Sequence, residues 1–297
     1  MTSLDRSSRI GFIGSGTVGG SLSSALAERG YHVVASASRT FSSAQGLAGR
    51  ISGCVAYQTG QEVADLTDVV FITTSDDVIG AVAARITWRP RQGVVHSSGA
   101  ESLGVFDSAV QQGALAGAFH PLQAFSSVEN GVKSIPGTTF GIEGEAEMRT
   151  YLDQMARDIG GNPIFLKSED KVLYHLSGVM IGNLLTALAA VSAQLWDQLG
   201  LTRADGVKAL APMMRQVSVN LATSGLPAAL AGPYPRGDIG TVRKHLETLT
   251  SRAPHVLPLY CELALAGLPF AVEKGTLQAD RAQEIKSLVE QFRDAKH

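Results

Sequence analysis

The chain has 297 residues, 44% of them hydrophobic and 18% charged, and its 25 basic side chains nearly balance 27 acidic ones, for a net charge of -2. This composition excludes a disordered chain, and the weak charge excludes a general nucleic-acid-binding protein, because neutralising phosphates requires clustered Lys and Arg. The length suffices for about two domains. The two cysteines, Cys54 and Cys261, lie far apart without Cys or His at metal-ligand spacing, so neither a disulfide framework nor a zinc site is expected.

The first half of the chain alternates short β-branched runs with helical patterns. This alternation predicts βαβ units and therefore an α/β fold, a Rossmann-type doubly wound parallel sheet covered by helices on both faces. The expected strands are 10–13, 32–36, 69–73, 94–96, 115–119, 138–142 and 163–166, and the clearest helices are 22–29, 78–86 and 145–159. We expect this first domain to cover residues 1–167.

After residue 167 the strand patterns stop, and residues 168–297 are predicted to form an all-helical domain. The helical patterns are 170–200, 204–224, 241–252, 256–266 and 279–295, separated by Gly- and Pro-containing turns at 225–227, 232–235 and 267–269. The uncharged segment 176–196 is long enough to span a membrane, but its polar side chains, such as Asn183 and Gln194, favour a buried core helix.

The same apolar segment predicts self-association, because it offers more apolar surface than one small helical domain needs to bury. We therefore expect a homodimer. The N-terminal residues lack the apolar run of a signal peptide, so a cytoplasmic location is expected.

A glycine-rich turn directly follows the first expected strand. Its residues are Gly14-Ser15-Gly16-Thr17-Val18-Gly19, the G-x-G-x-x-G pattern of dinucleotide-binding domains. In this pattern the first glycine permits a tight turn, the second lets the backbone approach a pyrophosphate, and the third lets the helix pack on the strand. The helix that begins here offers free N–H groups to phosphates. The alternative is an ordinary turn, and the strand–turn–helix context favours the cofactor site.

The end of the second expected strand distinguishes NAD from NADP. An NAD site usually places Asp or Glu there, whereas this chain has Ser38-Arg39-Thr40. Arg39 can form paired hydrogen bonds to a 2′-phosphate, and the hydroxyls of Ser38 and Thr40 add donors, so we predict NADP(H). The alternative is that Arg39 covers the adenine ring or is solvated. Small hydroxylated residues at two further strand ends are expected to contact the nicotinamide ribose: Thr73, Thr74, Ser75, Ser97 and Ser98.

Polar side chains recur on one side of the helical pattern that opens the second domain. Lys171, His175 and Asn183 are spaced four and eight residues apart. Hydride transfer to C=O or C=N also requires a proton donor, and His175 is the candidate general acid because histidine titrates near neutral pH, with Asn183 orienting it. The alternative is a hydrogen-bonded core histidine with a surface lysine.

Motifs over nearly the whole chain resemble a known family. They are Gly14–Gly19, His96-Ser97-Ser98-Gly99-Ala100, Phe119-His120-Pro121-Leu122-Gln123, Tyr174-His175, and the segment 232–238 with Thr241 and His245. These motifs resemble predicted oxidoreductases that pair a Rossmann-like domain with a helical domain of unknown function. That family resembles the 6-phosphogluconate dehydrogenase-like superfamily, which includes ketopantoate reductase and pyrroline-5-carboxylate reductase.

The resemblance implies a substrate site lined by His120, Gln123, Arg236, Asp238, Thr241 and His245. Arg236 would suit a substrate carboxylate. The alternatives are that His120 fixes its loop and that Asp238 caps a helix. Ketopantoate reductases carry a catalytic Lys eight residues before an Asn on this helix, and here His175 stands eight residues before Asn183.

The predicted function is therefore an NADPH-dependent reductase of a small 2-oxo acid such as ketopantoate. An imine reductase of the pyrroline-5-carboxylate type is the alternative enzyme, and a non-catalytic NADP-binding sensor is the alternative of a different class. No metal site is expected, because no histidine pair has the H-x-x-x-H spacing.

Overall fold

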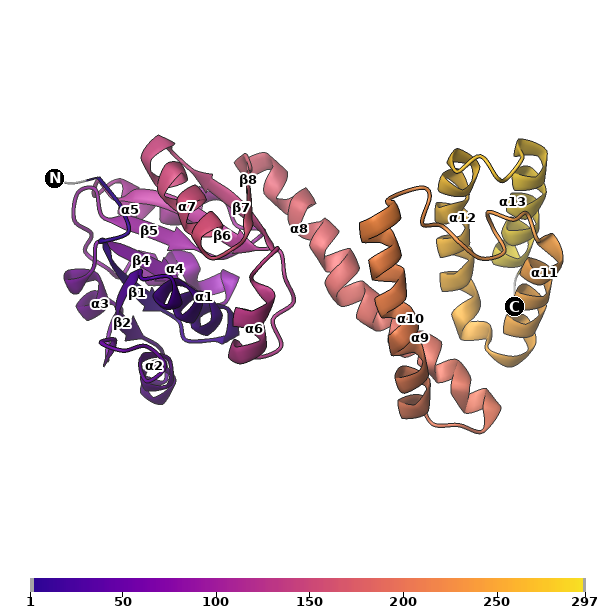
Figure 1. Ribbon diagram of the computed structural model, residues 1–297, viewed down its shortest axis with the longest axis horizontal. Helices are drawn as coiled ribbons and strands as arrows, with labels where there is room; N and C mark the ends of the chain where they lie inside the picture. The colour runs from indigo at the N-terminus through magenta and orange to yellow at the C-terminus, as the bar shows by residue number, and fades with distance from the viewer. Residues whose placement is uncertain (1–2, 296–297) are drawn as a thin grey trace. The chain divides into compact units, whose positions relative to one another are not determined.

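The computed structural model describes residues 3–295, and its contacts divide the chain into two compact units (Figure 1). The first unit ends at Asn183 and the second begins at Leu184. The described strands end with β8 (Asn162–Phe165), close to the boundary predicted at residue 167. The first unit nevertheless includes the next helix, α8 (Lys171–Val179), because the buried Lys171 at its start pairs with Glu143 of strand β7 (Thr139–Gly144).

The first unit contains an eight-stranded sheet in the order β3-β2-β1-β4-β5-β6-β7-β8, which is the doubly wound α/β arrangement predicted. Its other strands are β1 (Arg9–Ile13), β2 (His32–Ala37), β3 (Val55–Tyr57), β4 (Val69–Ile72), β5 (Gly93–His96) and β6 (Leu115–Pro121). All neighbouring strands are parallel except β6 and β7. The predicted parallel sheet is thus confirmed over its first six strands, and β7 and β8 run in the opposite direction to them. Pro121 at the end of β6 pairs with Phe140 near the start of β7, so the connection joins the two strands at the same end and does not cross the sheet.

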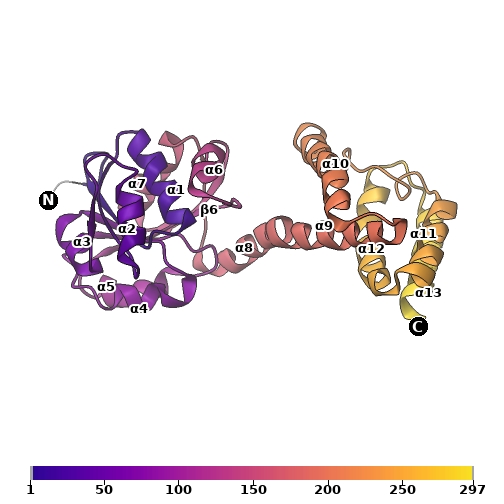
Figure 2. The same ribbon diagram turned by 90° about the horizontal axis from the view of Figure 1, so that it is seen from below.

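Helices cover both faces of the sheet, as predicted, and each face has its own apolar core. The helices are α1 (Thr17–Glu28), α2 (Phe41–Ala48), α3 (Gly60–Leu66), α4 (Ile79–Ala83), α5 (Asp107–Val110), α6 (Val128–Ser134) and α7 (Ala146–Asp158). Figure 2 shows α1, α6 and α7 on one side of this unit and α4 and α5 on the other. The short elements α2, β3, α3, α5 and α6 were not predicted, because segments of three to eight residues carry too little periodicity.

A row of phenylalanine rings packs across the sheet and holds the strands in register. Phe12 of β1 stacks on Phe71 of β4 with ring centroids 5.0 Å apart, and Phe119 of β6 stacks on Phe140 of β7 at 4.5 Å. All four rings are fully buried. Burying an aromatic side chain contributes about 1.5–3 kcal/mol, so this row supplies much of the core that aligns the carboxyl ends of β1, β4 and β6.

The helical pattern predicted at 170–200 consists of α8, a π-helical turn at Met180–Leu184 and α9 (Leu185–Gln194), followed by a 3-10 turn. The expectation that this segment is a buried core helix is wrong for the single chain. Leu173 and Ile181 are each 72% exposed. Of the most apolar 18 consecutive residues within Ser168–Leu199, only 6% are buried. By length and hydropathy alone, this stretch and Pro254–Glu273 would be long enough to cross a membrane.

The second unit contains α10 (Arg203–Ser224), α11 (Ile239–Arg252), α12 (Leu257–Glu273) and α13 (Ala279–Asp294). Its core lies among α11, α12 and α13, so the prediction of an all-helical second domain is confirmed. The turn predicted at 267–269 is wrong, because α12 continues through Pro269. Burial of Leu268 and Ala271 on either side of this proline offsets the lost backbone hydrogen bond.

Candidate functional site

The glycine-rich turn has the geometry that a dinucleotide site requires. Gly14 has a φ of +104°, and a Cβ atom there would lie 2.7 Å from the carbonyl carbon of Thr73. A Cβ on Gly19 would lie 2.4 Å from the Thr73 hydroxyl, so this glycine allows α1 to pack on the strand end. A Cβ on Gly16 would meet nothing within 4 Å, which leaves open space above the turn. The three glycines therefore have the three separate roles that the motif predicts.

The start of α1 fits a phosphate group. Gly16 precedes the helix and supplies no side-chain cap, so the N–H groups of Thr17 and Val18 remain available at the positive end of the helix dipole. The hydroxyl oxygen of Ser15 is buried and has no hydrogen-bond partner among residues 3–295. A bound pyrophosphate would satisfy these donors, so the residues present fit the dinucleotide.

Arg39 lies where the 2′-phosphate of NADP is expected, directly after β2. Its side chain is exposed and forms no ion pair within residues 3–295. Ser38 is half-buried and Thr40 precedes α2. The three residues are adjacent and exposed enough to contact a ligand, and their contact with a 2′-phosphate stays a prediction.

The hydroxylated residues at the ends of β4 and β5 have mixed roles. The hydroxyl of Thr73 donates to the Gly14 carbonyl at 2.6 Å and thus supports the glycine-rich turn. The hydroxyl of Ser98 donates to Asp76 at 2.7 Å, while the N–H groups of Ala100 and Glu101 donate to it. These two side chains organise the loops of the site. Thr74, Ser75 and Ser97 are partly or fully exposed, and their contact with the cofactor stays a prediction.

Three histidines gather beyond the carboxyl ends of β5 and β6. His96 ends β5, His120 lies near the end of β6, and His175 lies on α8. The rings of His120 and His175 meet edge to face with centroids 5.7 Å apart. Both rings touch Gly99, where a Cβ would lie 2.6 Å from His175 Cδ2 and 2.7 Å from His120 Nε2. Any side chain at position 99 would therefore separate the two rings.

Tyr174 joins this cluster through its hydroxyl, which lies 3.1 Å from His120 Nδ1 and donates to the His120 carbonyl at 3.4 Å. The Tyr174 ring packs against Gly141, since a Cβ there would lie 2.9 Å from its Cζ. Burial raises the pKa of Tyr174 to about 12, so the hydroxyl keeps its proton near neutral pH and acts as a donor.

Two of the three histidines are neutral at physiological pH. Burial, with the charges of Lys171 and His120, lowers the pKa of His96 to about 3, and burial, with the charges of His175 and Lys171, lowers the pKa of His120 to about 4. His96 is fully buried, and its Nδ1 accepts the Ser98 N–H at 3.2 Å. Its Nε2 has no hydrogen-bond partner within the described residues. The neutral ring therefore carries a buried, unpaired N–H donor.

Lys171 is a buried lysine at the first turn of α8, with 1% of its surface exposed. Its Nζ lies 3.4 Å from Glu143 Oε2, and the hydroxyl of Ser168 donates to the other oxygen of Glu143. Desolvation lowers the pKa of Lys171, and the negative charge of Glu143 opposes that effect. Lys171 and Glu143 thus form a buried ion pair, and no other cation within residues 3–295 lies within ion-pair distance of the Glu143 carboxylate.

Two predicted site residues of the first unit have other surroundings. Asn183 is exposed and belongs to the π-helical turn, whose wider winding displaces it around the axis from its α-helical position relative to His175. The Gln123 side chain donates to Thr138 Oγ1 at 3.3 Å and accepts the Ala124 N–H at 2.9 Å, so it fixes its own loop. Participation of either residue in catalysis or substrate binding stays a prediction.

The predicted substrate residues of the second unit mainly build the start of α11. Asp238 caps this helix by accepting the Thr241 N–H at 3.0 Å and the Thr241 hydroxyl at 2.7 Å, which is the structural alternative given for the motif. Arg236 is exposed. His245 lines a pocket, where its Nδ1 is 3.0 Å from the Tyr260 hydroxyl.

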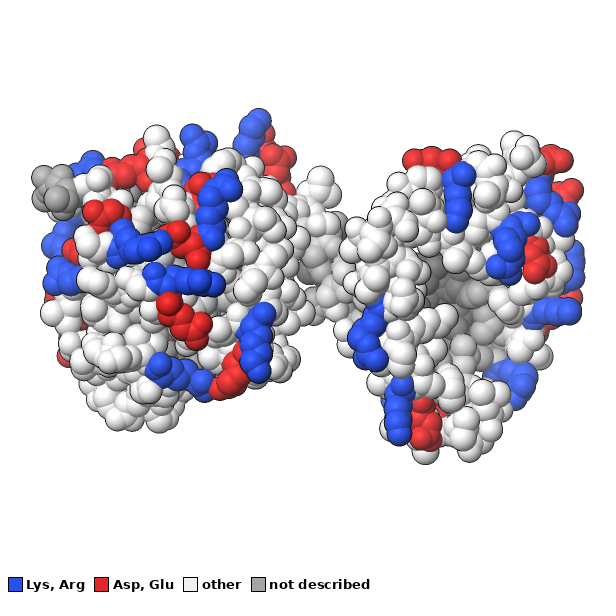
Figure 3. Space-filling model, in the orientation of Figure 1, with Lys and Arg blue, Asp and Glu red and all other residues white. Residues whose placement is uncertain are grey.

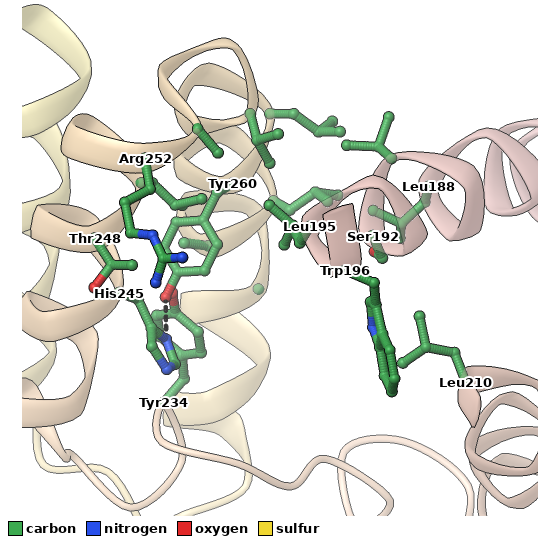
Figure 4. A pocket seen from close by; sticks show the side chains of 18 of the residues that line it. Leu188, Ser192, Leu195, Trp196, Leu210, Tyr234, His245, Thr248, Arg252 and Tyr260 are labelled. Carbon is green, nitrogen blue, oxygen red and sulfur yellow. Dashed lines mark hydrogen bonds between the residues drawn. The ribbon is translucent and has the colours of Figure 1, made fainter. Parts of the chain in front are cut away.

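The pocket of the second unit has a volume of about 760 Å³ and mostly aliphatic walls. Figure 4 shows His245 and Tyr260 joined by their hydrogen bond on one side, and Leu188, Leu195 and Trp196 on the other. Tyr234 lies beside the pair, and its buried hydroxyl has no hydrogen-bond partner among residues 3–295. Figure 3 shows that the second unit is hollowed between walls that are largely uncharged. Such a surface is suited to apolar contacts.

No group of three or more His, Cys, Asp or Glu side chains within residues 3–295 is arranged to hold a metal ion. The residues that sequence reasoning missed are Glu143 and Gly99. An acidic residue inside the apolar strand Thr139–Gly144 is a signal that a buried cation faces it. Nothing in the sequence indicates that Gly99 leaves room for two histidine rings to meet, because that contact joins three distant segments.

Two family models match parts of the chain. Residues 9–97 match the family described as NADP oxidoreductase, coenzyme F420-dependent, and residues 138–266 match a domain of unknown function, DUF2520. The first match contains the glycine-rich turn and Arg39. The N-terminal unit is thus the cofactor domain of an NADP-dependent oxidoreductase, as predicted. Its pairing with a domain of unknown function confirms that part of the resemblance, whereas the relation to ketopantoate reductase stays a prediction.

Solved structures share the fold over most of the chain. A provisionally named NADP oxidoreductase of Bacteroides fragilis is 23% identical with a TM-score of 0.72, and the match covers 89% of this chain and 99% of that one. A Thermotoga maritima protein is 25% identical with a TM-score of 0.71, covering 88% and 99%. A pyrroline-5-carboxylate reductase of Streptococcus pyogenes is 16% identical with a TM-score of 0.59, covering 98% and 100%. No curated protein matches the sequence.

Proposed function

We propose that this protein catalyses the NADPH-dependent reduction of a small 2-oxo acid to the corresponding 2-hydroxy acid. The observation that carries the proposal is the pair His120 and His175, which meet over Gly99 beyond the carboxyl ends of β5 and β6. Ligands of open α/β sheets bind in the crevice outside those strand ends. A branched acid such as ketopantoate is the substrate that we expect first.

NADPH supplies the hydride for such a reaction. The open space above Gly16 and the free N–H groups of α1 would hold its pyrophosphate, with Ser15 as an additional donor. Arg39 would hold the 2′-phosphate through paired hydrogen bonds. These contacts would hold the dinucleotide at the carboxyl ends of the strands, where the histidine cluster also lies.

The charges beside the histidines favour a carbonyl acceptor over an iminium ion. An iminium ion is positively charged and is stabilised by a free carboxylate, but the buried carboxylate of Glu143 is already paired with Lys171. A carbonyl oxygen instead becomes negative as hydride reaches its carbon, and N–H donors stabilise that charge. His175 in its protonated form then transfers its proton to the oxygen, which completes the hydroxyl group.

A cyclic imine of the pyrroline-5-carboxylate kind is the second candidate substrate. The pyrroline-5-carboxylate reductase of Streptococcus pyogenes shares the fold over 98% of this chain, which supports testing that class. A protein that binds NADPH without turnover would instead be a sensor of the cofactor.

The proposed function is tested by following NADPH absorbance in the presence of ketopantoate, other 2-oxo acids and pyrroline-5-carboxylate, each repeated with NADH. We expect turnover of a 2-oxo acid, with NADPH preferred. Turnover of the imine alone would replace the first proposal with the second. Tight NADPH binding without turnover of any compound would favour the sensor.

Two variants test the assigned residues. Arg39→Ala is expected to weaken NADPH binding by about 10- to 100-fold without weakening NADH, because hydrogen bonds to a charged group contribute about 1.5–3 kcal/mol. Arg29→Ala, at the exposed end of α1, is the matched control. His175→Ala is expected to lower kcat/KM about 100-fold while leaving the Kd of NADPH unchanged, as befits loss of a general acid. Exposed His255 provides the control variant His255→Ala.

We also propose that the protein is a homodimer whose second copy covers the exposed apolar helices. Leu173 and Ile181 are each 72% exposed, and Met213 of α10 is 62% exposed. Of the 22 residues of α10, only Gly206 is buried. An exposed apolar area of this extent supports a protein interface.

Light scattering of the purified protein tests the dimer. We expect twice the chain mass, and a monomer for Ile181→Glu, whereas the control Lys133→Glu at an exposed position of α6 should remain dimeric. A wild-type monomer at micromolar concentration would contradict the proposal. Flotation of the protein with phospholipid vesicles would show instead that a membrane covers the stretch Ser168–Leu199.

A further inference from the structure

The hydrogen bond between Tyr174 and His120 determines which nitrogen of His120 carries a proton. The Tyr174 hydroxyl has one proton and two acceptors within reach, His120 Nδ1 at 3.1 Å and the His120 carbonyl oxygen at 3.4 Å. Nδ1 is the nearer acceptor, and when it accepts this proton the neutral ring carries its own hydrogen on Nε2. Nε2 takes no part in this contact, so His120 then has an N–H donor for a ligand.

This donor lies beside the proposed proton donor. A Cβ on Gly99 would lie 2.7 Å from His120 Nε2 and 2.6 Å from His175 Cδ2, and the two rings are perpendicular within 10°, with an interplanar angle of 80°. A substrate oxygen that receives a proton from His175 would therefore lie within reach of the Nε2–H of His120. Two donors at one oxygen form the arrangement that stabilises a developing oxyanion.

Burial and the charges around His120 keep its ring neutral. The titratable groups that act on it or contact it are His96 on β5, and Lys171, Tyr174 and His175 on α8. Lys171 pairs with Glu143 of β7 and lies one turn before His175 on α8, and its charge disfavours a second positive charge on His120. Protonation of both rings would place two like charges in contact, which further disfavours a proton on His120.

We infer that His120 is a second catalytic residue, whose neutral ring donates a hydrogen bond from Nε2 to the substrate oxygen, and that Tyr174 and Lys171 are positioning residues that set its tautomer and its charge. This inference rests on the proposed reductase function. As hydride from NADPH bonds to the carbonyl carbon, the C=O π electrons move to the oxygen, and His175 transfers its proton there. His120 keeps its own proton and supplies only the hydrogen bond.

Nitrogen-15 NMR of the histidine rings in the full-length protein tests the positioning roles without any need for turnover. At pH 7 we expect His120 to be neutral with its hydrogen on Nε2. Tyr174→Phe should abolish the preference for that tautomer, whereas the control Tyr57→Phe on β3 should not. A wild-type ring that is protonated at pH 7, or that carries its hydrogen on Nδ1, would overturn the inference.

Lys171 is tested by the pH at which His120 takes up its second proton. Lys171→Met should raise that pH by about one unit, because a nearby like charge is removed. Because Lys171→Met leaves the Glu143 carboxylate buried without a cation, we also use the double variant Lys171→Met with Glu143→Gln, which leaves no unpaired charge. In this variant too, the pH at which His120 takes up its second proton should rise. Lys167→Met, at an exposed lysine, is the control. An unchanged titration in both Lys171 variants would refute the positioning role.

The catalytic role is tested with whichever 2-oxo acid the protein reduces. His120→Gln should lower kcat about 100-fold with the Kd of NADPH unchanged, as for loss of one oxyanion donor, and Tyr174→Phe should lower kcat by a smaller factor because the donor is misoriented rather than lost. Full activity in His120→Gln together with an inactive His175→Ala would overturn this inference and leave the proposed function intact. If no carbonyl compound is reduced, the proposed function and the catalytic role of His120 fall together, and the tautomer measurement still decides the role of Tyr174.

Discussion

Mild acid is expected to destabilise the N-terminal unit through His96. This ring is fully buried at the end of β5, and its pKa in the folded protein is lowered to about 3, chiefly by desolvation and next by the charge of Lys171. In the unfolded chain a histidine has a pKa of about 6.5. Between these two values the unfolded chain binds a proton that the folded protein excludes, so stability falls as the pH drops below about 6.5.

The magnitude follows from the difference between the two pKa values. Each pH unit below 6.5 lowers the free energy of unfolding by about 1.4 kcal/mol, so His96 alone accounts for about 2 kcal/mol between pH 7.5 and pH 5. The loss is complete only near pH 3, where the folded protein also binds the proton. Since typical domains are stable by only 5–15 kcal/mol, about 2 kcal/mol is readily measured.

The assay is urea denaturation at a series of pH values, followed by the fluorescence of Trp88 in a Trp196→Phe background. Trp88 is 4% exposed in the core of the N-terminal unit, so its signal reports on that unit. Between pH 7.5 and pH 5, the free energy of unfolding should fall by about 2 kcal/mol less in His96→Asn than in the parent protein. In the control His32→Gln, which removes an exposed histidine, the free energy of unfolding should fall by as much as in the parent. Equal losses for His96→Asn and the parent would refute the argument.

Two further predictions concern the cofactor turn and the second unit. Gly19→Val should abolish measurable NADPH binding, because its Cβ would lie 2.4 Å from the Thr73 hydroxyl, whereas Gly46→Ala, with no atom within 4 Å of its Cβ, should bind normally; fluorescence titration with NADPH distinguishes them. Asp238→Ala should lower the stability of the C-terminal unit by about 1 kcal/mol through loss of the α11 cap, as measured by thermal denaturation. Glu247→Ala in the middle of α11 should have a much smaller effect, and an equal effect of both variants would contradict the assigned cap.

Much of the N-terminal unit could be predicted because its signals are local. The glycine-rich turn lies between an apolar strand and a helix, and each glycine has a separate conformational or packing reason that follows from adjacent residues. The absence of an acid beside Arg39 is equally local, and it distinguishes NADP from NAD without knowledge of the fold. The helical second half was also recognisable from its periodicity, although Pro269 inside α12 shows that burial of neighbouring side chains can override a predicted break.

The histidine cluster could be predicted only in part. The sequence indicates His175 and His120 as candidates, because a histidine in an apolar helix or after an apolar strand calls for a partner or a function. It gives no indication that both rings touch Gly99, or that the Tyr174 hydroxyl contacts His120. These contacts join β5, β6 and α8, which are far apart in the chain.

The amino-acid sequence by itself determined the alternation of strands and helices, the dinucleotide turn and the preference for NADP, since each depends on neighbouring residues or on their spacing. Only the tertiary structure decided that β7 runs antiparallel to β6 and that Glu143 of β7 pairs with Lys171 of α8. Both depend on contacts between segments that are distant in the chain, and the desolvation of a buried charge likewise depends on every segment around it. The neutral state of His96 and His120, and hence the chemistry proposed for the site, follows from that burial rather than from any local motif.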